Sequence, residues 1–99
     1  TRPTAVVCDG DGFGRYVYHV LHKAGLRVPR DVSVIGAGDL PFARQLDPPL
    51  TTIRWPLERM GREAVRLLVS RAAFPDRGAV RVLLDTGVVI RHSTGPAPC

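Results

Sequence analysis

The chain has 99 residues, of which 44% are hydrophobic and 23% are charged, and its formal net charge is +5. This length and composition fit one modest globular domain and are too apolar for a disordered chain. No apolar run approaches the roughly 20 residues that a membrane-spanning helix needs, which excludes a membrane segment. The two cysteines, Cys8 and Cys99, predict no disulfide framework, and no Cys/His group has zinc-finger spacing.

The positive charge is spread along the chain. Residues 1–50 carry 6 basic and 5 acidic side chains, and residues 51–99 carry 8 and 4. Many arginines have an acidic neighbour at helical spacing, as in Glu58–Arg62 and Arg59–Glu63. This pattern favours a solvated, salt-bridged surface over a nucleic-acid-binding surface.

A parallel strand–helix–strand unit opens the expected fold. The β-branched run at residues 4–8 is typical of a strand covered on both faces. Apolar residues recur every three or four positions over residues 13–24, which indicates a helix with Asp11 as N-cap and Gly25 as the C′ glycine. Residues 32–36 form a second buried strand, so the connection between the strands is a right-handed crossover.

The second half adds a loop, an extended crossing, a helix and terminal strands. Residues 37–50 contain glycine turns and a Pro-Pro pair, which predict a loop with at most one short helical turn. Residues 51–55 are extended, and the apolar spacing predicts a helix over residues 57–71. Two short strands are expected at residues 80–84 and 88–91. The fold class is therefore α/β.

The most suggestive segment for chemistry is Asp-Gly-Asp-Gly-Phe-Gly at residues 9–14, because loops at the carboxyl ends of parallel strands bind ligands in open α/β sheets. One interpretation is catalytic. A strand followed by Asp-x-Asp-Gly is similar to the nucleophile motif of haloacid dehalogenase-like phosphatases, where Asp9 would attack phosphorus and Asp11 would act as acid/base. Asp39, which follows the second strand, would then be that family's later metal-binding acid, and the short spacing between Asp9 and Asp39 leaves no room for the family's other motifs. The alternating glycines are a weak nucleotide-binding signal.

A third interpretation is ligand recognition without chemistry. Five segments carry it, in order along the chain: Arg-Pro-Thr-Ala-Val-Val-Cys-Asp-Gly-Asp (2–11), Ala-Gly-Leu-Arg-Val-Pro-Arg-Asp-Val-Ser-Val-Ile-Gly (24–36), Asp-Pro-Pro-Leu-Thr-Thr-Ile (47–53), Met-Gly-Arg-Glu-Ala (60–64) and Val-Ile-Arg-His-Ser-Thr-Gly (89–95). Together they resemble the lactose-repressor (LacI/GalR) family of bacterial transcription regulators. The resemblance implies the C-terminal part of an effector-binding core with a partial periplasmic-binding-protein-like type I fold, in which two subdomains enclose a ligand cleft.

By this resemblance, residues 1–50 belong to the C-terminal subdomain. Residues 51–79 are a hinge crossing and a helix of the N-terminal subdomain, and residues 80–99 are return strands and a tail. The chain starts without Met or a signal peptide, so we expect a piece of a longer cytoplasmic regulator. The implied partners are a small-molecule effector of sugar or nucleoside type, a homodimer or higher oligomer, and operator DNA bound through a missing N-terminal domain.

The resemblance also implies ligand-binding residues. The family's cleft acid falls on Asp11, although the alternative that Asp11 only caps the helix stays open. Where the family commonly has Gly-aromatic-Asp-Asp, this chain has Gly-Ala-Gly-Asp at residues 36–39, so Asp39 is the remaining acid. Trp55 could stack on a ligand or pack in the hinge. The candidate ligand-binding residues are thus Asp11, Trp55 and Asp39, with no catalytic residue, metal or cofactor expected.

Alternatives to the transcription regulator remain at this stage. A secreted sugar-binding protein of the same fold would differ in having an upstream signal peptide, and the phosphatase would require Mg²⁺. We interpret His19 and His22 as surface residues rather than a metal pair. The apolar face of helix 57–71 would lack cover in an isolated chain, which predicts self-association.

Overall fold

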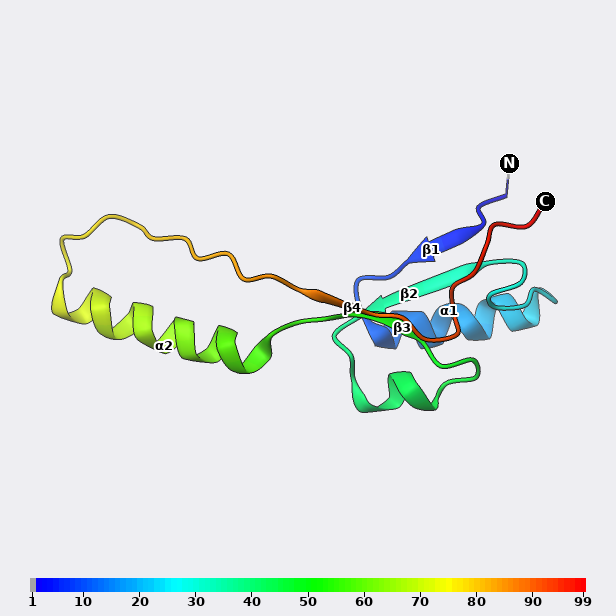
Figure 1. Cartoon of the computed structure of the whole chain (residues 1–99), viewed down its shortest axis with the longest axis horizontal. Coiled ribbons are helices and arrows are strands. Elements are labelled where there is room, and N and C mark those ends of the chain that lie inside the picture. The colour runs from blue at the N-terminus through cyan, green and yellow to red at the C-terminus, as the bar shows by residue number, and fades with distance from the viewer. Residues whose placement is uncertain (1) are drawn as a thin grey trace. The chain divides into compact units, whose positions relative to one another are not determined.

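The computed structural model describes residues 2–99. The elements follow in the order β1 (Ala5–Val7), α1 (Asp11–Lys23), β2 (Ser33–Ala37), the 3₁₀ helix η1 (Pro41–Gln45), β3 (Thr51–Arg54), α2 (Leu57–Ala73) and β4 (Gly87–Val89) (Figure 1). The chain divides into two compact units. One contains the described residues up to Trp55 together with Gly87–Cys99, and the other is Pro56–Thr86.

The first unit is built on a four-stranded sheet in the order β1-β2-β3-β4. β1 pairs with β2 and β2 with β3 in parallel, whereas β4 runs antiparallel to β3. The expected α/β class with a parallel strand–helix–strand unit is confirmed. The expected short helical turn in the loop after β2 is also present, as η1.

The core of this unit lies between α1, the sheet and η1. Cys8, Val34, Ala43 and Leu50 form its buried centre, and α1 adds Val17 and other partly buried apolar side chains. α1 packs against β2 on the face of the sheet that carries Val34, and Val6 of β1, the neighbour of Val34, lies on the same face, because side chains alternate between the two faces of a strand.

The expectation that the first strand is covered on both faces is wrong. Val7 in β1 is 72% exposed, because the second face of β1 has no cover within the described residues. Burial on both faces requires elements on both sides of a sheet, and α1 supplies only one.

The sequence pattern predicts the C-terminal end of α1 correctly, but not its N-terminal end. At the C-terminus, Gly25 has a positive φ of 73°, and the amides of Gly25 and Leu26 donate to the carbonyls of His22 and Leu21. These bonds form a Schellman motif, as expected for a C′ glycine. At the N-terminus, the expected Asp11 cap is wrong: Gly10 is the N-cap, and Asp11 is the first helical residue. The carboxylate of Asp11 is instead drawn away from the helix by partners on other elements.

The closing segment of the chain is held on the sheet by buried hydroxyls. The Thr51 amide donates to Ser93 Oγ over 2.8 Å, and the Ser93 hydroxyl donates to the Val34 carbonyl over 2.6 Å. These bonds attach the residues after β4 to the middle of the sheet, although they lie far from it in sequence.

The second unit contains α2, none of whose residues is buried. Glu58 pairs with Arg62 at 2.7 Å, as expected, whereas Glu63 pairs with Arg66 rather than with Arg59. The strand expected at residues 80–84 is wrong, since these residues have no secondary structure. A strand needs a neighbour for its backbone hydrogen bonds, and the described part of the chain offers none here. None of the described helices has the length and apolarity to span a bilayer.

Candidate functional site

The candidate site lies at the carboxyl ends of β1 and β2, where the acidic turn leads into α1. Asp11 is fully buried at this edge. Its Oδ1 accepts a hydrogen bond of 2.6 Å from the Thr52 hydroxyl, and its Oδ2 accepts one of 2.7 Å from the Leu40 amide. One carboxylate therefore connects the start of α1, the loop after β2, and β3.

Close approach to β2 is possible because position 36 is a glycine. A Cβ built on Gly36 would overlap Asp11 Oδ1 and would lie 2.8 Å from Leu50 Cδ2. Gly14 on α1 is almost as close, since its Cβ would lie 3.0 Å from the same Leu50 atom. These two glycines let the first turn of α1 and the Leu50 side chain pack directly on the strand backbone.

The second acid at this edge, Asp39, is held by two arginines. Arg91 donates to Oδ1 over 2.5 Å and Arg54 donates through Nε to Oδ2 over 2.7 Å, and the Asp39 side chain is only 8% exposed. The hydrogen bond from Arg91, with a further contribution from Arg54, holds the pKa of Asp39 below its ordinary value of 3.8 against the opposing effect of burial. Arg91 also donates to the Leu50 carbonyl over 2.9 Å. Asp39 thus fastens β3 and the segment after β4 to the loop after β2.

The backbone at this loop is unusual. Asp39 has a φ of 52° and Gly38 a φ of 115°. Residues other than glycine rarely adopt the backbone conformation of Gly38, so this position favours glycine. The Asp39 amide donates a long hydrogen bond, 3.4 Å, to Thr52 Oγ1, so Thr52 contacts both acids.

A cavity of about 660 Å³ opens beside this turn. It is lined by residues from the acidic turn, the start of α1, the end of β2 and its loop, and the end of β3: Gly10, Asp11, Gly12, Phe13, Tyr16, Ala37, Gly38, Leu40 and Trp55. All of them belong to the first unit. The volume lies within the range typical of small-molecule sites.

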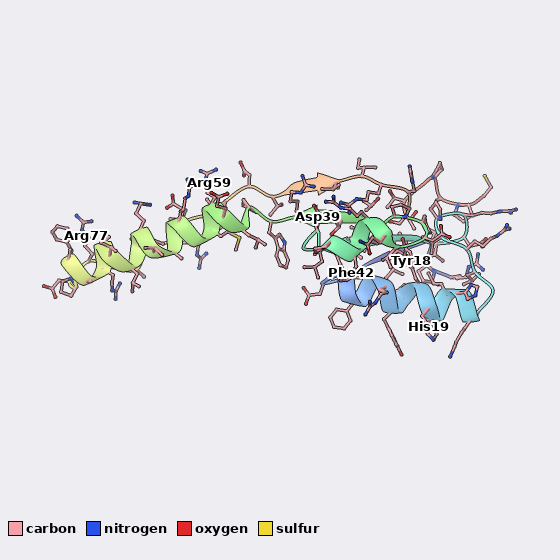
Figure 2. The ribbon with its side chains drawn as sticks, turned by 90° about the horizontal axis from the view of Figure 1, so that it is seen from below. Tyr18, His19, Asp39, Phe42, Arg59 and Arg77 are labelled. Atoms are coloured by element: carbon pink, nitrogen blue, oxygen red, sulfur yellow. The ribbon has the colours of Figure 1, made fainter. Side chains whose placement is uncertain are left out.

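The structure brings two of the three candidate residues to this cavity. Asp11 and Trp55 are among its lining residues, whereas Asp39 is not one of them and is paired with Arg54 and Arg91. Figure 2 shows Asp39 and Phe42 near the end of the α1 ribbon where the helix begins, and His19 towards the other end. The Arg15 guanidinium lies 5.0 Å from the centre of the Phe42 ring.

Sequence reasoning missed the three large apolar residues that line the cavity besides Trp55, which are Phe13, Tyr16 and Leu40. Phe13 was expected to lie on the buried face of the helix, but it is 64% exposed. The available signal was the position of Phe13 and Tyr16, three residues apart on the helix turn that follows the acidic segment. That spacing places two aromatic rings on the same face as the turn.

The two acids of the Asp-x-Asp motif have different environments. Asp9 is exposed, whereas Asp11 is buried with both oxygens occupied by partners in the protein. Within residues 2–99, no group of three or more His, Cys, Asp or Glu side chains is arranged to hold a metal ion. The burial and the internal hydrogen bonds of Asp11 do not fit the acid/base role that the phosphatase interpretation gave to this residue.

Comparisons with known proteins identify a family whose sequences this chain resembles. A family model described as "Periplasmic binding protein-like domain" matches residues 1–94. The "Ribose operon repressor" of Haemophilus influenzae is 38% identical over 93 residues, which are 94% of this chain and 28% of that protein. The chain therefore spans less than a third of the length of this relative.

Solved structures show the same similarity. The "transcriptional regulator CelR-cellobiose complex" superposes with a TM-score of 0.83 at 40% identity, covering 91% of this chain and 28% of that one. A LacI family transcriptional regulator from Enterococcus faecium with bound ribose gives a TM-score of 0.80 at 30% identity, covering 97% and 36%.

Proposed function

The chain belongs to the periplasmic-binding-protein-like family, in the form found in LacI-type transcriptional regulators, and from this premise we propose that it forms part of the effector-binding core of such a regulator. The observation that carries the proposal is the cavity beside Asp11, at the edge of a parallel sheet where α/β proteins bind ligands. The effector is a small molecule. Similar proteins have been solved with cellobiose and ribose, which supports a sugar- or nucleoside-sized ligand.

In this proposal, residues 1–50 belong to one subdomain, residues 51–79 cross a hinge into the other, and residues 80–99 return. Trp55 lines the cavity and is also the last residue of the first unit before Pro56. A ligand that contacts Trp55 therefore acts on the residue where the chain leaves that unit.

Asp11 has a positioning role in the proposed mechanism. Its hydrogen bonds connect the start of α1 to the loop after β2 at Leu40 and to β3 at Thr52, so these three segments move as one body. A ligand that binds one arrangement of the two subdomains better than another shifts the population towards it, by no more than the difference in affinity. The protein senses the ligand and does not transform it.

Operator DNA, in this proposal, is contacted by a part of the regulator outside these residues. The protein acts in the cytoplasm as a homodimer or higher oligomer. The exposed apolar residues of α2 support association, since large exposed apolar patches promote it. Light scattering should therefore show an assembly larger than one chain, and a stable monomer at high concentration would contradict this part of the proposal.

Two measurements test the function. Thermal unfolding of the purified chain with a panel of sugars and nucleosides should reveal at least one compound that raises the midpoint, because a ligand at one hundred times its Kd stabilises by about 2.7 kcal/mol. Titration with DNA should show, at most, weak and salt-dependent binding without sequence preference. Nanomolar, sequence-specific DNA binding by these residues, or no response to any small molecule, would contradict the proposal.

A further inference from the structure

The cavity is lined mainly by apolar and aromatic side chains. Phe13, Tyr16, Leu40 and Trp55 are large side chains that are between 40% and 67% exposed, and all four line this one cavity. Solvent-exposed apolar side chains scattered singly are ordinary, but a group around a concave site marks a place where apolar surface is buried on binding.

The acids at this edge are not free to bind a sugar. Asp11 accepts from the Thr52 hydroxyl and the Leu40 amide, and its side chain is fully buried, so that no surface of the carboxylate is left to meet a ligand. Asp39 is engaged by Arg54 and Arg91 and does not line the cavity. A carboxylate that has exchanged water for internal donors gives up those bonds only if the buried donors are left unpaired, which is unfavourable.

Most of the remaining lining residues are glycines. Gly10, Gly12 and Gly38 contribute no side chain, and nothing lies within 4 Å of the position that a Cβ on Gly12 would take. Gly38, with its φ of 115°, disfavours any side chain there. The polar side-chain atoms left to meet a ligand are the Tyr16 hydroxyl and the Trp55 indole N–H. Such a lining accepts the face of a ring and offers few partners to a ligand whose surface is mostly hydroxyl groups.

We propose that the effector recognised by this chain is a planar aromatic heterocycle, such as a nucleobase or nucleoside, which stacks on Trp55, Phe13 and Tyr16, rather than a simple sugar. This proposal rests on the proposed effector-binding function and narrows it. The ring faces supply most of the contact, and the indole N–H and the phenol hydroxyl orient the polar edge of the ligand.

The test uses Trp55, which is the only tryptophan in the sequence, so its fluorescence reports on the cavity directly. Adenosine and ribose are the matched probes, because they differ only by the base. Adenosine should quench Trp55 saturably, and ribose should bind at least about tenfold more weakly, since stacking of a base on an aromatic side chain contributes about 1–3 kcal/mol. Uridine and cellobiose extend the same comparison.

A matched pair of variants locates the binding. Phe13→Ala should weaken adenosine binding by about tenfold. Phe74→Ala removes a comparably exposed phenylalanine (64% for Phe13 and 53% for Phe74) in the second unit, which contributes no residue to the cavity lining, and should leave the affinity unchanged. Circular dichroism of both variants shows that the fold is retained.

The outcomes separate the two proposals. Ribose or cellobiose binding as tightly as adenosine would overturn the aromatic-ligand proposal and leave the effector-binding function standing. No fluorescence change and no thermal stabilisation with any compound would overturn both. A fluorescence change that depends on protein concentration and not on ligand concentration, and that Phe13→Ala abolishes, would overturn the ligand proposal. It would show that the apolar lining of the cavity binds a second copy of the chain.

Discussion

The Thr52 hydroxyl donates to Asp11 Oδ1 over 2.6 Å, and both side chains are fully buried. The bond joins the first residue of α1 to the second residue of β3, which are 41 positions apart in sequence. Since Asp11 also accepts from the Leu40 amide, the turn beside the cavity is held by side-chain chemistry and not by local backbone preference alone.

The first prediction concerns this carboxylate. Asp11→Asn presents an NH₂ group to one of two donors, so one hydrogen bond is lost and a buried donor stays unpaired. We expect the free energy of unfolding to fall by about 1–3 kcal/mol, as measured by urea denaturation. Asp9→Asn is the matched control, because Asp9 is exposed at the same turn, and it should change stability by less than about 0.5 kcal/mol. Equal effects of the two substitutions would contradict the assigned role of Asp11.

The second prediction concerns the close approach at Gly36. Gly36→Ala places a methyl group against Asp11 Oδ1 and Leu50, so strand and helix must separate. We expect a loss of about 1–3 kcal/mol in the free energy of unfolding, as for overpacked cores. Gly61→Ala serves as the control in the interior of α2, where a Cβ meets nothing within 4 Å. It should stabilise by about 0.5–1 kcal/mol because alanine favours helix over glycine. A Gly36→Ala protein as stable as the parent would show that this contact is relaxed in solution.

The third prediction is a pH dependence. The pKa of Asp39 is lowered in the folded state, chiefly by the hydrogen bond from Arg91. A group with a depressed folded pKa stabilises the fold above its unfolded pKa, and this contribution is lost as the pH falls through the folded value. We therefore expect stability to decrease as the pH drops below about 4, measured by thermal unfolding across acid pH.

Two variants isolate this contribution. Asp39→Asn should lower stability at neutral pH by about 1–3 kcal/mol, because the Arg91 side chain, which is only 13% exposed, then lies without its counter-ion. The difference from the parent protein should shrink at acid pH, where Asp39 is protonated. Asp76→Asn changes an exposed acid in the second unit and should leave the whole pH profile unchanged. A difference in stability between Asp39→Asn and the parent protein that stays constant with pH would contradict the role of ionised Asp39.

The fourth prediction concerns the two thiols. Cys8 is buried in the core, and burial raises the pKa of its thiol, whereas Cys99 is exposed. Because the thiolate is the reactive form, iodoacetamide should alkylate Cys99 in the native protein and reach Cys8 only after denaturation. Mass spectrometry of digested samples reads out each site. The Cys99→Ser variant should be unreactive until unfolded, and rapid labelling of Cys8 in that variant would show that the first unit opens readily.

Local pattern alone determined the order and type of most elements. The 3.6-residue spacing predicts α1 and α2, the β-branched runs predict β1 to β3, and Gly25 ends α1 as expected. These features depend on neighbours only a few positions away, so the physical information is contained in short segments. The strand expected at residues 80–84 failed for the same reason, because strand formation depends on a partner that a short segment does not specify.

The tertiary structure decided the character of the site. The sequence with its family resemblance indicated Asp11, Asp39 and Trp55, but it could not show that the donors to Asp11 come from residues 29 and 41 positions away, or that Arg91 reaches Asp39 across 52 positions. Nor could it show that Phe13 and Tyr16 stay exposed beside Trp55, since exposure depends on which segments fold over a side chain. Asp11 and Asp39, which the sequence offers as ligand-binding acids, are engaged by hydrogen bonds within the protein. The aromatic side chains line the cavity instead.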